Sequence, residues 1–144
     1  MSKRMARSAA DIMTTDIVSV EEHQSIRSAS EALELLRFRH VPVTDGDRLL
    51  GLVSQRDLLR VGASSALPNS ESQSSFLAGI IRVKDIMSTE LRTVGPDTPL
   101  HEVAMLMHKE KLGCVPVIEG TNTLVGLITE ADIVALAAVI LQNE

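Results

Sequence analysis

Two short segments of the sequence place a carboxylate three residues after a hydroxyl side chain. They are Ser54–Asp57 (SQRD) and Thr129–Asp132 (TEAD), and each follows a run of aliphatic residues typical of a strand. At a helix start, this pair can cap the backbone N–H groups. The same N–H groups also suit a phosphate, and an Asp can accept hydrogen bonds from two ribose hydroxyls. On these residues alone, capping without a ligand is the stronger interpretation.

The two segments differ at the residue that precedes the Asp. Arg56 occupies this position in the first segment and Ala131 in the second. Because a guanidinium offers forked donors that suit phosphate, we predict that phosphorylated ligands prefer the Asp57 site. The Asp132 site should be weaker or more nucleoside-like. The alternative for Arg56 is a solvent-exposed arginine at a helix start.

Both segments belong to a longer repeat. Asp11–Met13 recurs as Asp85–Met87, and Val41–Val43 recurs as Val115–Val117 at the same spacing. One extra residue in the second turn shifts the rest of the repeat by one position. A register kept over this length indicates duplication of a structural unit.

Each repeat predicts the order strand, helix, strand, strand, helix, which is an α+β unit. The first short strand is Ile17–Val20 or Leu91–Val94, and the turn after the Val-Pro-Val strand carries Asp45-Gly46 in the first repeat. The first helix of each repeat has apolar residues at helical spacing: Ile26, Ala29, Leu33 and Leu36, then Leu100, Val103, Ala104 and Met107.

The repeats set the expected domain boundaries. We predict domains over residues 10–61 and 82–137, a Ser-rich linker over 62–81, and a helix end over 138–144. Phe76, Leu77, Ile80 and Ile81 are expected to hold the far end of the linker against the body of the protein.

Composition excludes several classes of protein. The net charge is −5 without a basic block, and the chain has two Phe, no Trp and no Tyr, so nucleic-acid binding is disfavoured. The longest apolar run, Ile133–Leu141, is far shorter than the roughly 20 residues of a membrane span. With no signal peptide recognised, a cytoplasmic location is the default expectation.

Other reactive residues have plainer explanations. His40 and Cys114 occupy equivalent positions in the two repeats and could form a nucleophile pair or half of a metal site. A buried cysteine that acts as a small hydrophobic residue is the stronger interpretation. His101 and His108 share a helix face without a third ligand, and Glu21–His23 is expected to be a solvated loop. We find no catalytic triad and predict neither an enzyme nor a metal site.

The duplicated, ordered set of motifs resembles a tandem pair of cystathionine-β-synthase (CBS) domains, often called a Bateman module. These motifs are the D-I-M start, a short strand with Ser or Thr before Val, and the hydrophobic-Pro-Val strand. Each repeat then ends with Gly, two hydrophobic residues, Ser or Thr, two further residues and Asp. The resemblance covers nearly the whole chain, with no other domain recognised. It implies two units packed about a pseudo-twofold axis through their sheets, in a stand-alone regulatory protein.

The resemblance also implies two clefts that bind adenosine-containing ligands such as AMP, ADP, ATP or S-adenosylmethionine. In this family the Asp of one repeat grips ribose, and the first strand of the other repeat reads adenine. One site would comprise Leu52, Ser54, Arg56, Asp57, Leu91, Arg92, Thr93, Val94 and Cys114. The other would comprise Ile17, Val18, Ser19, Val20, His40, Leu127, Thr129 and Asp132. The adenine nucleotide would be a regulatory ligand, not a catalytic cofactor.

The family often dimerises through helices, which makes Ile133–Leu141 the candidate dimer contact. This segment is apolar nearly all round a helix and needs burial on more than one side. Packing within the monomer, against Phe76 and Leu77, is the alternative. The main rival function is a ligand-free structural dimerisation module whose hydroxyl and Asp pairs are only caps.

Overall fold

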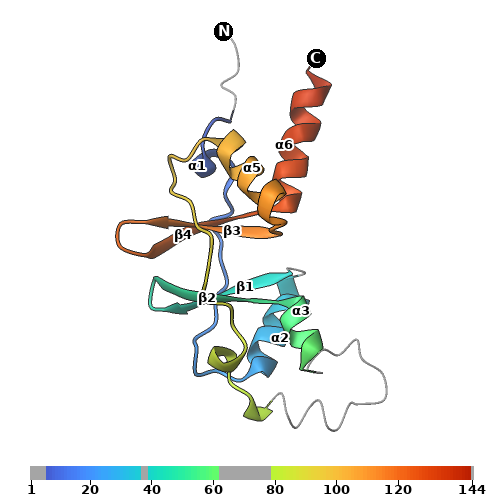
Figure 1. The fold of residues 1–144 in the computed structure, drawn as a ribbon. Helices are drawn as coiled ribbons and strands as arrows, with labels where there is room; N and C mark the ends of the chain where they lie inside the picture. The colour runs from blue at the N-terminus through green and yellow to red at the C-terminus, as the bar shows by residue number, and fades with distance from the viewer. Residues whose placement is uncertain (1–5, 37–38, 62–78, 144) are drawn as a thin grey trace. The chain divides into compact units, whose positions relative to one another are not determined.

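The computed structural model describes residues 6–36, 39–61 and 79–143, which form two compact units (Figure 1). We name Val18–Leu91 the central unit, and Met1–Ile17 with Arg92–Glu144 the terminal unit. Phe76, Leu77 and most of the expected linker lie outside the described residues, whereas Ile81 packs against the core of the central unit and Ile80 is 54% exposed.

The central unit is an antiparallel hairpin with two helices on one face (Figure 1). Strands β1 (His40–Asp45) and β2 (Arg48–Ser54) turn at Gly46, whose φ of +62° glycine adopts without strain. Helices α2 (Ile26–Leu36) and α3 (Gln55–Arg60) contact each other and the hairpin. Their apolar side chains form one core: Val20, Ile26, Ala29, Leu33, Val41, Val43, Val53, Leu58 and Val83. The last of these begins a 3₁₀ turn, η1 (Val83–Asp85).

The terminal unit repeats this plan. Strands β3 (Cys114–Glu119) and β4 (Thr123–Thr129) form the hairpin, and helices α5 (Leu100–Glu110) and α6 (Glu130–Gln142) pack against it. A short helix, α1 (Ala9–Ile12), also contacts β4. The buried core comprises Ala9, Val103, Met107, Val115, Val117 and Ile128.

The first strand of each repeat is shorter than the sequence pattern predicts. In Ile17–Val20 only Val20 pairs, in a parallel bridge to Val43, and in Leu91–Val94 only Val94 pairs, with Val117. The Val20 N–H donates to the Pro42 carbonyl at 3.0 Å. Because Pro42 has no N–H, it cannot donate a hydrogen bond from β1 back to the Ile17–Val20 segment. The pairing of this segment with β1 therefore depends on the residues next to Pro42.

The compact units do not coincide with the sequence repeats 10–61 and 82–137. Asp11–Met13 starts the first repeat yet packs in the terminal unit, while Asp85–Met87 starts the second repeat and packs in the central unit. Each compact unit therefore contains the D-I-M segment of the other repeat. The chain passes from one unit to the other after Ile17 and again after Leu91.

Candidate functional site

The hydroxyl and carboxylate pairs predicted from the sequence form the N-terminal caps of α3 and α6. In the central unit the Asp57 N–H donates to Ser54 Oγ at 3.0 Å, and the Ser54 N–H donates to Asp57 Oδ2 at 2.8 Å. In the terminal unit the Asp132 N–H lies 3.4 Å from Thr129 Oγ1, and the Thr129 N–H donates to Asp132 Oδ2 at 2.8 Å. Both are capping boxes, as the residue types predict.

Each cap engages one carboxylate oxygen and leaves the other for a different contact. The Asp57 side chain is 16% exposed, and its Oδ1 lies 3.9 Å from Arg60 Nη1, a weak ion pair. Within residues 6–36, 39–61 and 79–143, no donor contacts Oδ1 of Asp132. Capping and ribose binding are therefore chemically compatible at both helix starts, because the carboxylate can accept at its second oxygen.

The strand residue opposite each cap differs between the units. His40 pairs with Ser54 across β1 and β2, and Cys114 pairs with Thr129 across β3 and β4. Burial raises the pKa of the Cys114 thiol to about 12, and the negative charge of Asp132 adds to the rise. A thiol held neutral is a poor nucleophile and metal ligand, which favours its role as a small hydrophobic residue.

The described residues include every member of the two predicted ligand-binding sets. The central unit holds Val18, Ser19, Val20, His40, Leu52, Ser54, Arg56, Asp57 and Leu91. The terminal unit holds Ile17, Arg92, Thr93, Val94, Cys114, Leu127, Thr129 and Asp132. Each predicted set draws on both units, and its grouping into one site stays a prediction. Cys114 is a predicted member of the set that contains Asp57, but within the terminal unit it lies close enough to Asp132 for the charge of that carboxylate to affect its pKa.

Besides the capping residues, Ser19 and Arg92 of the predicted sets also have polar partners in their own units. The hydroxyls of Ser19 and buried Thr44 lie 3.0 Å apart. Arg92 forms a 3.0 Å ion pair with Glu110 at the end of α5. Since these side chains are held by other residues, their hydrogen bonds to a ligand would be made in addition to these contacts or in exchange for them.

Sequence analysis missed Arg60, whose guanidinium approaches Asp57 from within α3. The signal was available, because residues three apart on a helix lie on one face. Its equivalent in the terminal unit is Ala135, just as Ala131 is the equivalent of Arg56. The two arginines, one at each end of the short helix α3, are thus a feature of the central unit.

His23, His101 and His108 are the other candidates for reactive or metal-binding side chains. Among the described residues, no group of three His, Cys, Asp or Glu side chains could hold a metal ion. His101 and His108 are exposed on α5, and the exposed His23 lies 3.5 Å from its neighbour Glu22. Nor does any helix in the described part of the chain have the length and apolar character to cross a membrane.

Solved structures with the same fold cover nearly the whole chain. A Vibrio cholerae protein assigned to acetoin utilization is 35% identical, with a TM-score of 0.78, and the match covers 96% of this chain and 95% of that one. The protein CBSX2, solved in complex with AMP, is 27% identical, with a TM-score of 0.77 and coverage of 94% and 98%. The cytosolic domain of the Mg²⁺ channel MgtE, solved in complex with ATP, is 27% identical, with a TM-score of 0.69 and coverage of 90% and 48%.

Curated relatives are of two kinds. The chain spans 25% of an inosine-5′-monophosphate dehydrogenase from Korarchaeum cryptofilum, which is 28% identical over 133 residues that make up 92% of this chain. It spans 82% of the CBS domain-containing protein YhcV from Bacillus subtilis, also 28% identical, over 88% of this chain. The chain thus corresponds to a small part of a multidomain enzyme and to most of a short protein.

The family itself follows from the two repeats. The CBS domain profile matches residues 9–64 and again residues 83–138, so that both matches include a D-I-M segment, a hairpin and a capped helix start. Together they cover well over half of the chain. The chain belongs to the CBS domain family and carries a pair of CBS domains.

Proposed function

We propose that this CBS pair is a regulatory module that binds an adenosine-containing ligand at sites built around Asp57 and Asp132. The main observation behind this proposal is the geometry of the Asp57 and Asp132 carboxylates. Each caps a helix start through Oδ2, so that Oδ1 can accept a hydrogen bond from another donor. Similar CBS proteins solved with AMP and ATP support an adenine nucleotide as the ligand. The two residue sets predicted from the sequence remain our proposal for the sites.

The two sites should differ in their preference for phosphate. Helix α3 carries Arg56 and Arg60 in its short length, whereas α6 has Ala131 and Ala135 at these positions. Arg56 is exposed and forms no ion pair with any described residue, so its guanidinium can meet an incoming anion. We infer that the Asp57 site takes AMP, ADP or ATP, and that the Asp132 site takes ligands with less phosphate charge.

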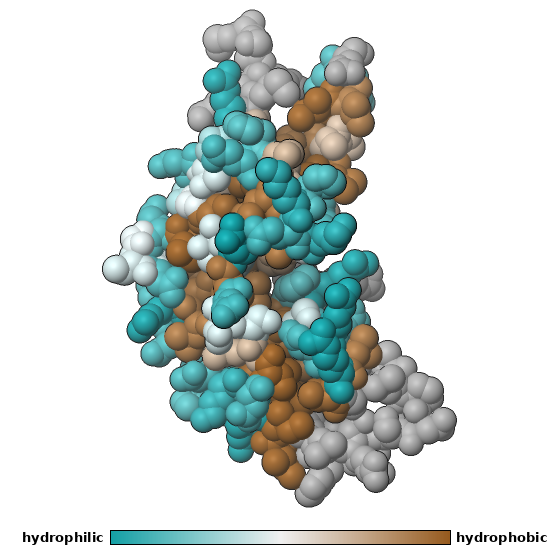
Figure 2. Space-filling view, viewed as in Figure 1, coloured by the Kyte–Doolittle hydropathy of each residue, from teal (hydrophilic) through white to brown (hydrophobic). Residues whose placement is uncertain are grey.

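Signalling by such a module requires two states with different affinity for the ligand. We propose that the protein forms a homodimer and that the two states are states of this dimer. Helix α6 would form part of the dimer interface. In α6 the exposed fractions of Val134, Val139 and Leu141 are 67%, 55% and 67%. Figure 2 shows hydrophobic residues on the surface of this helix. Exposed apolar side chains on more than one side of a helix favour a protein partner. A regulatory, non-enzymatic role in the cytoplasm remains the prediction from the sequence.

Sedimentation equilibrium tests the dimer. We expect concentration-dependent association that Val134→Glu weakens, and Leu35→Glu, at an 84% exposed position on α2, serves as the control. A monomer at high micromolar concentration would contradict the dimer while leaving ligand binding intact.

The alternative is a ligand-free structural module, and the formed capping boxes favour it directly. Both hydroxyls and both carboxylates already have partners, and capping by itself accounts for these residue types. This module would keep its assembly and stability whether or not adenine nucleotides are present.

The ultraviolet spectrum of the freshly purified protein distinguishes the two functions. Because the chain has no Trp and no Tyr, co-purified adenine would dominate the near-ultraviolet absorbance. We expect an adenine band, and acid release with mass spectrometry would name the ligand. If the spectrum lacks the band and added AMP, ATP and S-adenosylmethionine all fail to bind, the structural module is favoured.

A further inference from the structure

Each compact unit is closed by a segment that belongs to the other sequence repeat. We name these segments the straps: Ser8–Thr14 in the terminal unit and Arg82–Ser88 in the central unit. Thr14 and Leu127 exchange both backbone hydrogen bonds, at 2.8 and 3.0 Å. Ser88 and Leu52 do the same, at 2.9 and 3.0 Å. Both straps therefore pair with the second strand of a hairpin in the same way.

A methionine of each strap lies directly on a hairpin glycine. A methyl group added to Gly126 would overlap Sδ of Met13 and lie 2.7 Å from its Cγ. A methyl group added to Gly51 would lie 2.9 Å from Sδ of Met87 and 2.8 Å from the backbone oxygen of Ser88. Neither glycine has a positive φ, so the need for glycine here comes from the close approach of the strap.

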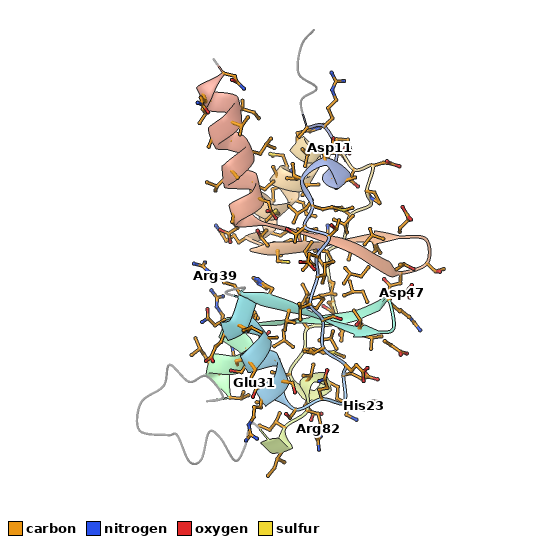
Figure 3. The ribbon with its side chains drawn as sticks, turned by 180° about the vertical axis from the view of Figure 1, so that it is seen from behind. Asp11, His23, Glu31, Arg39, Asp47 and Arg82 are labelled. Atoms are coloured by element: carbon orange, nitrogen blue, oxygen red, sulfur yellow. The ribbon has the colours of Figure 1, made fainter. Side chains whose placement is uncertain are left out.

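The other two residues of D-I-M hold the strap in shape. Asp11 Oδ2 accepts from the N–H groups of Arg7 and Ser8 at 2.8 and 3.0 Å, and so caps α1 (Figure 3). Asp85 Oδ2 accepts from the Arg82 N–H at 3.3 Å. Ile12 and Ile86 pack against the cores of their units. In both copies the Asp caps the strap turn, the Ile is partly buried and the Met contacts a glycine.

The straps connect the two halves of the predicted ligand-binding sets. Leu52 and Leu127 precede the capping residues Ser54 and Thr129 by two positions, so the strap is fixed close to each helix start. Beyond the straps, the chain runs directly into Ile17–Val20 and Leu91–Val94.

We propose that Met13 and Met87 are positioning residues for ligand binding, an inference that rests on the proposed function. By clamping each strap on its glycine, they fix the start of the segments that carry the predicted adenine-reading residues. A loosened strap therefore weakens ligand binding, although neither methionine touches the ligand.

Gly126→Ala in the full chain tests the clamp, with backbone amide exchange as the readout. We expect the Thr14 and Leu127 amides to exchange about tenfold faster or more, because overpacking at this contact favours local opening. Gly95→Ala is the matched control in the same unit, since its nearest atoms would lie at the ordinary distances of 3.8 and 3.9 Å. Equal exchange rates in the two variants would overturn the clamp.

Double substitution separates the contact from a general loss of stability. Met13→Ala removes the contacts of Sδ and Cγ with the new methyl group in Gly126→Ala but keeps Met13 Cβ 2.9 Å from it, so the two changes should be non-additive with partial rescue. Met87→Ala should likewise rescue Gly51→Ala only in part, because the backbone oxygen of Ser88 stays 2.8 Å from the new methyl group. Additive effects in both pairs would contradict the methionine contact. If Gly126→Ala does not fold, Met13→Ala alone replaces it, with faster strap exchange expected.

Titration with AMP tests the positioning role. We expect lower AMP affinity in Gly126→Ala and in Met13→Ala, and unchanged affinity in Gly95→Ala. If the straps loosen and AMP affinity stays at the wild-type value, the positioning role is wrong. If the wild-type protein binds none of AMP, ATP and S-adenosylmethionine, the proposed function and the positioning role both fail, and the exchange rates still decide the clamp.

Discussion

The helix starts of the central and terminal units share a capping geometry but differ in the groups beside it. In the central unit Asp57 lies next to Arg56 and Arg60, and His40 stands opposite Ser54. In the terminal unit Asp132 lies next to Ala131, and the buried, neutral Cys114 stands opposite Thr129. Duplication thus kept the cap, while substitution at its edges gave the two units different electrostatic character.

The shared feature serves the fold, and the differing features can set ligand preference. A Ser or Thr with an Asp three residues later stabilises each helix start regardless of ligand. Arg56 has no ion-pair partner among the described residues and can therefore bind an anion. The terminal unit has Ala131 at the equivalent position, so this possibility exists in the central unit alone. Variants that alter one unit at a time can therefore separate the two roles.

The largest expected effect is on ligand affinity in Asp57→Asn and Asp132→Asn. Each change removes a charged acceptor, and such hydrogen bonds contribute about 1.5–3 kcal/mol, or roughly 10- to 150-fold in affinity. Calorimetric titration with AMP should show the larger loss in Asp57→Asn, because that unit carries the arginines. Asp47→Asn, in the exposed β1–β2 turn, is the control. Wild-type affinity in both variants would favour the structural module.

A smaller effect is expected when the arginine difference is exchanged. Arg56→Ala should weaken AMP binding at the Asp57 site by about tenfold or less, since one exposed charge-assisted contact is lost. Ala131→Arg should strengthen AMP binding at the Asp132 site, and both effects should shrink at high salt. Arg48→Ala, also exposed in the central unit, controls for net charge. Unchanged affinity in Arg56→Ala would remove the proposed phosphate preference.

The cysteine of the terminal unit predicts a loss of stability at alkaline pH. Its pKa is raised from 9.0 to about 12 in the folded protein, so the folded state holds the proton more tightly than the unfolded state. This stabilisation is fully present below about pH 9 and is lost as the pH rises towards 12, at up to about 1.4 kcal/mol per pH unit. Urea unfolding of Cys114→Ala should show a shallower decline, and an unchanged slope would contradict the prediction.

The smallest expected difference is between the two caps. Ser54→Ala should lower the free energy of unfolding by about 1 kcal/mol, and Thr129→Ala by about half as much. The reason is the distance from the hydroxyl oxygen to the Asp N–H, which is 3.0 Å in the central unit and 3.4 Å in the terminal unit. Urea titrations measure both values, and a larger loss in Thr129→Ala would reverse the comparison.

Much of the fold was predictable because local signals agreed with it. Helical spacing predicted the buried faces of α2 and α5, and Ile26, Val103 and Met107 are indeed buried. Asp45-Gly46 predicted the hairpin turn, and Gly46 has the expected positive φ. The lengths of the first strands were predicted less well, because each strand forms only a single bridge. Strand propensity is a weak signal where only one neighbouring strand is available for pairing.

The exchange of D-I-M segments was not predictable from the repeats. Both repeats carry the same D-I-M start and the same hairpin glycine, so either strap fits either hairpin by residue type. Sequence alone predicted the caps around Asp57 and Asp132 because capping depends on neighbours three residues apart. The ion pair of Arg92 with Glu110 and the contact of Met13 with Gly126 join residues distant in sequence, and no local pattern indicates them.

The most direct test of the central claim is a calorimetric titration of AMP into the dialysed wild-type protein, with GMP as the comparison. Adenosine binding at the Asp57 and Asp132 sites predicts saturable AMP binding that is clearly tighter than that of GMP and is lost in Asp57→Asn with Asp132→Asn. If AMP, ATP and S-adenosylmethionine all fail to bind saturably at millimolar concentration, the capped helix starts serve the fold alone.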